Sequence, residues 1–148
     1  MHMRSTTDPV ASLRSDIRLT LPARPENVAV VRHVLGALAE SLGLPRAVTE
    51  DMRLAVTEAC TNVVRHAYTG DEGSIDVVVR STRAELEVIV SDTGRGDGPS
   101  RDDSGPGLGL GLIAALSDSL EIKHSADTGS RVTMSFRRTS RPRAIGFA

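Results

Sequence analysis

Glu58 and Asn62 are polar residues one helical turn apart, in a stretch whose apolar residues recur with helical spacing. The two side chains therefore share a face that points away from the apolar stripe, with Arg65 beside them. A carboxylate next to an amide can hold a water or a hydroxyl together with Mg²⁺, which prefers few protein oxygens and several phosphate oxygens. An ordinary solvated face is the alternative. For His66, near the helix end, a packed ring or a cap is more common than a ligand.

Asp92 ends a run of alternating apolar residues, and glycines follow at positions 94 and 96. A buried carboxylate at a strand end can accept a hydrogen bond from the exocyclic amine of an adenine ring. Gly94 and Gly96 let the backbone approach the base and sugar, and each can take a positive φ without steric cost. The same pattern also occurs in ordinary hairpin turns.

A second glycine run follows within a dozen residues and leads into an apolar stretch. It predicts a mobile loop, from Gly105 to Gly111, that covers a bound nucleotide and leads into a short helix. The first N–H groups of that helix could bind phosphates. The run is neither a Walker loop nor a Rossmann fingerprint, because it lacks the lysine of the first and the preceding strand of the second.

Periodicity predicts the elements that position these residues. Alternating apolar residues predict strands over 16–23, 74–80, 85–92, 120–123 and 131–137. Helices are expected from Asn27, as the cap, to Gly43, from Pro45 to about Tyr68, and over about 108–117. This order lacks the strict alternation of a doubly wound sheet. Because each strand is apolar on one side, we expect an α+β two-layer sandwich: a mixed, mostly antiparallel sheet with helices on one face.

The bulk composition narrows the class of protein. The 148 residues suit one domain, expected over 15–138, with a disordered segment at 1–14 and a flexible basic tail at 139–148. A net charge of −1 gives no reason to expect nucleic acid as a partner. Cys60 is the only cysteine, which excludes an intramolecular disulfide and fits a reducing compartment. No apolar run approaches the roughly 20 residues that span a bilayer, so a cytoplasmic protein is expected.

Taken in order, these motifs resemble those of a known superfamily. The pairs Glu58-x-x-x-Asn62 and Asp92-x-Gly94-x-Gly96, the glycine loop and a late "GSRVTM" resemble the N, G1, G2 and G3 boxes of the GHKL, or Bergerat-fold, ATP-binding superfamily. Within it, the short chain and "EACTNVVRHAY" are most similar to anti-sigma-factor serine kinases of the RsbW and SpoIIAB type. The resemblance covers about residues 16–138.

The resemblance implies a Bergerat fold that binds ATP and Mg²⁺. It implies that Asp92 binds the adenine amine with help from Ser130, that Asn62 binds the metal, and that Glu58 is the base that activates an incoming serine hydroxyl. The remaining nucleotide-binding residues that it implies are Arg65, His66, Gly94, Gly96, Gly105, Gly107, Leu108, Gly109, Leu110 and Gly111. The implied partners are a sigma factor, which the kinase sequesters, and a STAS-type anti-anti-sigma factor, which it phosphorylates, and the implied assembly is a homodimer.

Three classes of function remain open, and one departure from the family pattern bears on the choice between the first two. The best-known kinases of this group carry an arginine just before the G-x-G of the loop, where this chain has Gly105 and its nearest arginine is Arg101. Glu58 favours a serine/threonine-protein kinase, whereas the missing arginine favours a non-catalytic ATP-binding module. The third class, part of a histidine kinase with His33 as phosphoacceptor, needs a dimerising hairpin for which there is no room. His33 is therefore expected on the surface of the first helix.

Overall fold

The computed structural model describes residues 15–70, 72–96 and 109–139. Within these ranges the strands are β1 (Ser15–Pro22), β2 (Ser74–Ser81), β3 (Glu85–Asp92), β4 (Ser119–Ser125) and β5 (Gly129–Arg137). The helices are α2 (Pro25–Ser41), α3 (Arg46–Asn62) and α4 (Gly109–Leu116), and a π-helical turn, η2 (Val63–Ala67), continues α3. The segment predicted to be disordered, 1–14, and nearly all of the predicted tail lie outside the described residues.

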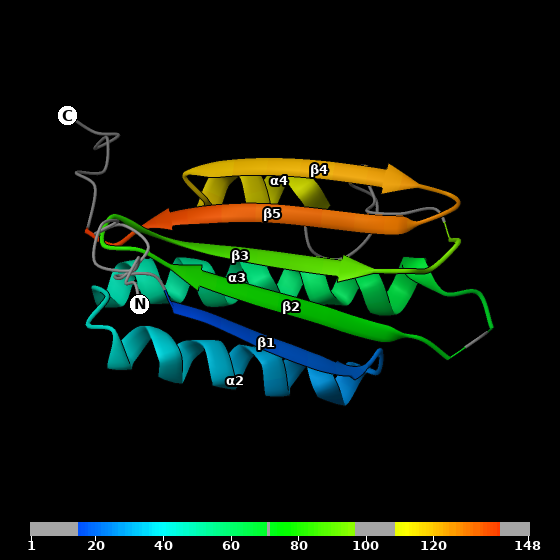
Figure 1. Ribbon diagram of the computed structural model, residues 1–148, viewed down its shortest axis with the longest axis horizontal. Helices are drawn as coiled ribbons and strands as arrows, with labels where there is room; N and C mark the ends of the chain where they lie inside the picture. The colour runs from blue at the N-terminus through cyan, green and yellow to red at the C-terminus, as the bar shows by residue number, and fades with distance from the viewer. Residues whose placement is uncertain (1–14, 71, 97–108, 140–148) are drawn as a thin grey trace, which may run out of the picture.

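The five strands form one sheet in the order β1-β2-β3-β5-β4, and the helices cover one of its faces (Figure 1). The α+β two-layer prediction is confirmed. All four strand pairings are antiparallel, however, so the expectation of a mixed sheet is wrong for the described strands. The reason is topological: α2 and α3 together return the chain to β2 in the opposite direction, and β5 is inserted between β3 and β4, which run the same way.

The core lies between the sheet and the helices. Every second residue of β2 and β3 is buried against the helical layer, as the alternation predicts. The largest fully buried side chains come from the three helices and from β2, β3 and β5. They include Leu35, Met52, Ile75, Leu86, Ile113, Met134 and Phe136. None of the helices in the described part of the chain is long and apolar enough to cross a membrane.

The first helix begins two residues before the predicted cap. Its N-cap is Arg24, Pro25 occupies the first turn, and no side chain caps it. The proline has a fixed φ that suits this position and lacks the N–H that a cap would satisfy. Asn27 instead donates from Nδ2 to the carbonyl oxygen of Pro22, 2.8 Å away. His33 is exposed on this helix, as expected, with Nδ1 2.7 Å from the carbonyl oxygen of Ala29.

The second helix has the predicted length but changes character at its end. After Asn62 the turn widens into η2, and Tyr68 is extended. Such π-helical turns are frequent at functional sites. The helix after the second glycine run begins at Gly109, with φ of +59°. Gly109, Leu110 and Gly111 therefore lie in α4 and not in the predicted loop, whereas Gly105, Gly107 and Leu108 lie outside the described residues.

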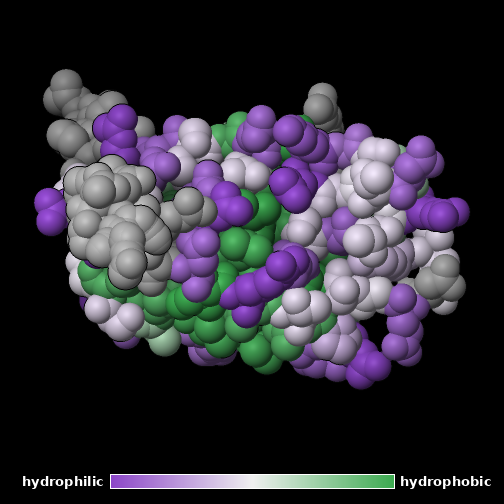
Figure 2. Space-filling model, viewed as in Figure 1, coloured by the Kyte–Doolittle hydropathy of each residue, from purple (hydrophilic) through white to green (hydrophobic). Residues whose placement is uncertain are grey.

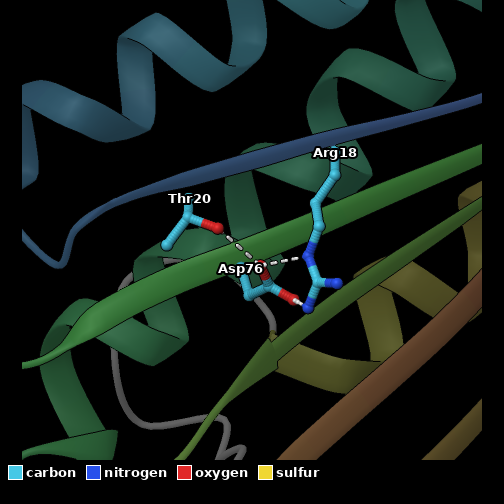
Figure 3. A network of polar contacts seen from close by, with 3 residues as sticks. All are labelled: Arg18, Thr20 and Asp76. Carbon is cyan, nitrogen blue, oxygen red and sulfur yellow. Dashed lines mark hydrogen bonds and ion pairs between the residues drawn. The ribbon is translucent and has the colours of Figure 1, made fainter.

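A polar network crosses the outer face of the sheet, where Figure 2 shows hydrophilic side chains beside a hydrophobic area. Asp76 on β2 accepts hydrogen bonds from Arg18 Nε at 3.1 Å and Nη2 at 2.9 Å, and from Thr20 Oγ1 at 2.8 Å (Figure 3). The hydrogen bond from Arg18 holds the pKa of Asp76 below its usual value, against the smaller effect of burial. The folded protein therefore binds this proton more weakly than the unfolded chain does, and the pair stabilises the fold above the ordinary aspartate pKa.

We predict that Asp76→Asn lowers the free energy of unfolding at pH 7 by about 0.5–1 kcal/mol, because the pair is partly exposed to solvent. Thermal melts should show a decrease of about 2–4 °C in Tm. The difference from the parent protein should vanish as the pH falls through the lowered pKa of Asp76, since both side chains are then neutral. The exposed Asp127, changed to Asn, is the control and should leave Tm unchanged. A difference that persists at low pH would contradict the assigned role of the charge.

Candidate functional site

The carboxylate of Asp92 is buried at the end of β3, with 7% of the residue exposed. Its Oδ1 accepts hydrogen bonds from the N–H of Gly94 at 2.9 Å and from the N–H of Ser130 at 3.3 Å. Burial raises the pKa of Asp92, and the two N–H donors partly offset that effect. The other oxygen, Oδ2, makes no hydrogen bond to any described residue. The carboxylate is thus fixed through one oxygen and presents the second to an incoming donor.

Asn62 lies opposite Asp92 at the end of α3 and is also buried, with 7% of the residue exposed. Its Nδ2 is buried without a hydrogen-bond partner in the described part of the chain. The two residues line one small cavity, of about 10 Å³, between α3, η2 and the ends of β3 and β5. A buried amide without a partner costs free energy. The unpartnered Nδ2 therefore makes Asn62 a candidate for binding a ligand at this cavity.

The position of Asn62 differs from the one expected from the helical pattern. Asn62 follows Ala59 by three residues, so it lies at the edge of the buried stripe and faces the end of the sheet. An ordinary solvated face is therefore wrong for Asn62. Glu58, one turn earlier, is half-buried, whereas Arg65 on η2 is exposed and His66 is half-buried. Among the described residues, no hydrogen bond or ion pair joins these three side chains to Asp92 or Asn62.

β5 brings Ser130 beside Asp92, which agrees with the proximity that the family resemblance implied. The two residues are register partners in the β3–β5 pairing. The Ser130 hydroxyl lies 2.9 Å from Nδ1 of His124 on β4, a neighbour that the sequence analysis missed. Gly129 was also missed; its φ is +96°, and a Cβ there would overlap the carbonyl oxygen of Asp92. The signal for Gly129 was available, since this glycine follows a polar turn and comes two residues before the predicted strand at 131–137.

Gly94 and Gly96 serve the site in a different way from the one expected. Neither has a positive φ. A Cβ on Gly94 would overlap the carbonyl oxygen of Ala67, and one on Gly96 would overlap that of His66. The N–H of Gly96 donates to Ala67 O at 2.8 Å. The glycines therefore let the loop after β3 pack directly against the backbone of η2, and this contact holds the loop that follows Asp92.

A larger hollow, of about 750 Å³, opens around the same end of the sheet and extends over its outer face. Lys123 and Arg131, register partners on β4 and β5, line it together with Arg18 and Asp76. Its outer carboxylate, Asp76, is already paired with Arg18. Apart from its border with Asp92, the hollow therefore offers exposed cations and hydroxyls but no free carboxylate among its lining residues. The small cavity, lined by Asp92 and by Asn62 with its unpartnered Nδ2, is the better candidate for specific recognition of a base.

Residues 21–136 match the family described as "Histidine kinase-like ATPase domain". The chain is 38% identical to a serine-protein kinase RsbW of Bacillus thuringiensis (strain Al Hakam) over 134 residues, which cover 80% of this chain and 82% of that protein. It is equally similar to the serine-protein kinase RsbW of Bacillus cereus (strain 03BB102), with 38% identity and the same shares covered.

A solved structure shares the fold. The structure of the RsbU and RsbW domains of Rv1364c from Mycobacterium tuberculosis superposes with a TM-score of 0.63 at 24% identity. The match covers 86% of this chain and 34% of that longer chain. At this identity the likeness supports the fold, and the arrangement of sheet and helices is common to both proteins.

We predict that Gly96→Ala destabilises the protein by about 1–3 kcal/mol, because the added methyl group forces the loop away from the backbone of His66. Gly111→Ala is the matched control. A Cβ at Gly111 meets no atom within 4 Å, and alanine in a helix should raise stability by about 0.5–1 kcal/mol. Urea unfolding followed by circular dichroism measures both effects. Equal stability of the two variants would show that the contact between the loop and η2 is not tight.

Proposed function

The chain belongs to the histidine kinase-like ATPase domain family, and we propose that it is an ATP-dependent serine-protein kinase that regulates a small protein partner. The observation that carries the proposal is the buried pair at the end of the sheet. Asp92 and Asn62 line the same cavity, Asp92 is held through Oδ1 by backbone N–H groups, and Nδ2 of Asn62 has no partner among the described residues. The similarity to serine-protein kinases named RsbW supports the reaction class.

Adenine is the base that suits Asp92. The exocyclic amine of adenine donates a hydrogen bond that Asp92 Oδ2 can accept, since Oδ1 is held by two backbone N–H groups. A purine with a keto group at the same position would bring an acceptor against a carboxylate, which is unfavourable. Ser130 contributes through its N–H, which orients the carboxylate. Base selection in this proposal therefore rests on a charged acceptor whose burial raises its pKa.

Mg²⁺ is proposed to accompany the nucleotide. Within the described ranges no group of three or more His, Cys, Asp or Glu residues could hold a metal ion. The donor set nevertheless fits Mg²⁺, which takes one or two protein oxygens and completes its shell with phosphate oxygens and water. Asn62 would supply its amide oxygen, Oδ1, to the ion, while its Nδ2, which has no partner among the described residues, could donate to a phosphate oxygen. When bound, the ion neutralises charge on the phosphates.

Glu58 is proposed as the general base. It lies one turn before Asn62 on the same face of α3 and is half-buried, so that solvent or a partner protein can reach it. The carboxylate accepts the proton of a serine hydroxyl while that oxygen bonds to the γ-phosphorus and ADP leaves. Arg65 and His66, on the adjoining turn, are proposed to border the nucleotide.

The proposed partners follow the family resemblance. The acceptor serine belongs to a STAS-type anti-anti-sigma factor, the regulated protein is a sigma factor, and the kinase is a cytoplasmic homodimer. A non-catalytic ATP-binding module is the second candidate. The observation that favours it is Gly105, where the best-known kinases of this type carry arginine, although this position lies outside the described residues.

We predict that Asp92→Asn weakens ATP binding by about 1–3 kcal/mol, roughly 5- to 150-fold, because asparagine turns an amide donor toward the adenine amine. The ratio of the Kd values for ATP and inosine triphosphate should shift toward inosine triphosphate, since its keto group can accept from that amide. Isothermal titration calorimetry measures both ligands on each protein.

The ligand-free variant should be at least as stable as the parent protein at pH 7. The raised pKa means that the folded protein binds this proton more tightly than the unfolded chain, so ionisation of Asp92 costs stability once the pH exceeds that pKa. Unchanged ATP affinity in a folded variant would remove Asp92 from the adenine site. Equal losses for both nucleotides, together with a lower Tm, would assign Asp92 a structural role instead.

We predict that Glu58→Gln lowers the rate of phosphoryl transfer at least about 100-fold and leaves ATP affinity nearly unchanged, because a base acts in the transition state. Glu50→Gln, an exposed residue on the same helix, is the matched control and should transfer at the parent rate. The assay follows phosphoserine on a purified STAS-domain protein under single-turnover conditions. A parallel loss of ATP affinity in Glu58→Gln would show that Glu58 binds the nucleotide complex and is not the base.

A further inference from the structure

Tyr68, the only tyrosine of the chain, connects three segments at the candidate site. Its hydroxyl donates to the carbonyl oxygen of Ser74 at 2.8 Å and accepts from the N–H of Ser74 at 3.2 Å. The same oxygen accepts from the N–H of Thr93 at 3.2 Å. One phenolic oxygen therefore joins the end of η2, the start of β2 and the residue that follows Asp92.

The ring of Tyr68 packs where only a glycine leaves room for it. Gly73, just before β2, faces the ring directly, and a Cβ at this position would overlap the ring atoms. The ring is half-buried and packs against the hydrophobic core. The ring is thus held between the backbone at Gly73 and the end of η2, and its position sets the orientation of the hydroxyl.

The loop after β3 has two contacts with this helix end. The N–H of Gly96 donates to Ala67 O, and the N–H of Thr93 donates to the Tyr68 hydroxyl. Between them lies Gly94, whose N–H holds Asp92 Oδ1. Because Thr93 is bonded to Asp92 in the chain, a shift of Thr93 rotates the carboxylate away from the direction in which Oδ2 is presented.

We propose that Tyr68 is a positioning residue for base recognition: its hydroxyl sets the register between the helix that carries Asn62 and the strand that carries Asp92. This inference rests on the proposed role of Asp92 in binding adenine. Tyr68 acts through Thr93 and the loop and does not touch the base. The hydroxyl therefore controls selectivity for adenine more than the stability of the fold.

The test compares Tyr68→Phe with Thr82→Val. Phenylalanine keeps the ring against Gly73 and removes only the hydroxyl. The Thr82 hydroxyl makes a similar set of contacts at the other end of the β2–β3 hairpin, to the backbone of Ala84 and Glu85, and is remote from Asp92. Each variant loses one hydroxyl that makes three hydrogen bonds to the backbone, so the two Tm values should fall by similar amounts.

Selectivity should separate the two variants. We expect Tyr68→Phe to lower the preference for ATP over inosine triphosphate by roughly three- to tenfold, the effect of about one lost hydrogen bond, and Thr82→Val to leave it unchanged. In the ligand-free protein, the amide of Thr93 should exchange its hydrogen faster in Tyr68→Phe, because it has lost its acceptor. Calorimetry measures the preference, and NMR-detected hydrogen exchange measures the amide.

An unchanged preference in folded Tyr68→Phe overturns the inference. Gly73→Ala is the second variant: its methyl group displaces the ring, and it should lower the same preference even if Tyr68→Phe folds poorly. The proposed adenine site is tested separately: unchanged ATP affinity in Asp92→Asn would contradict that site. If Asp92→Asn loses selectivity while both Tyr68→Phe and Gly73→Ala keep it, the adenine site stands and the positioning role of Tyr68 does not.

Discussion

The buried carboxylate of Asp92 constrains the arrangement of every element around it. A carboxylate removed from water needs hydrogen-bond donors, and backbone N–H groups from the loop after β3 and from β5 supply them at one oxygen. Gly94 must therefore follow closely on the strand, and Ser130 must lie beside it in the sheet. The second oxygen has no such donor among the described residues. We propose that a bound ligand supplies a donor to it.

Close backbone packing transmits this constraint to the helix layer. The loop after β3 lies against the carbonyl groups of His66 and Ala67, which only glycine at 94 and 96 allows. At the same place the helix end widens into η2, and Tyr68 leaves the helix in an extended conformation. Asn62, just before this turn, is thereby held over the same cavity as Asp92. Metal, base and phosphate recognition are thus proposed to depend on one junction between helix and sheet.

Much of this arrangement was predictable from local patterns. Alternation bounded by turn residues predicted β3 at 85–92, as observed. The helical spacing of Glu58 and Asn62 and the place of Asp92 at a strand end made these residues candidates, and their roles stay predictions. The burial of Asn62 was not predictable. The periodicity of apolar residues gives the buried face of the helix as a whole, and it does not say that the end of the sheet lies opposite the last turn. The start of α2 at Pro25 was missed because a side-chain cap was expected where a proline suffices. The roles of Gly94, Gly96 and Tyr68 depend on contacts between segments distant in sequence, which periodicity does not contain.

We propose that adenine binds between α3 and the end of the sheet, with its amine on Asp92. A crystal structure of the protein with Mg²⁺ and a non-hydrolysable ATP analogue would show where the base lies. We expect the adenine amine within about 3 Å of Asp92 Oδ2, in a cavity wider than the present 10 Å³. A base bound instead in the hollow over the outer face, against Lys123 and Arg131, would contradict it.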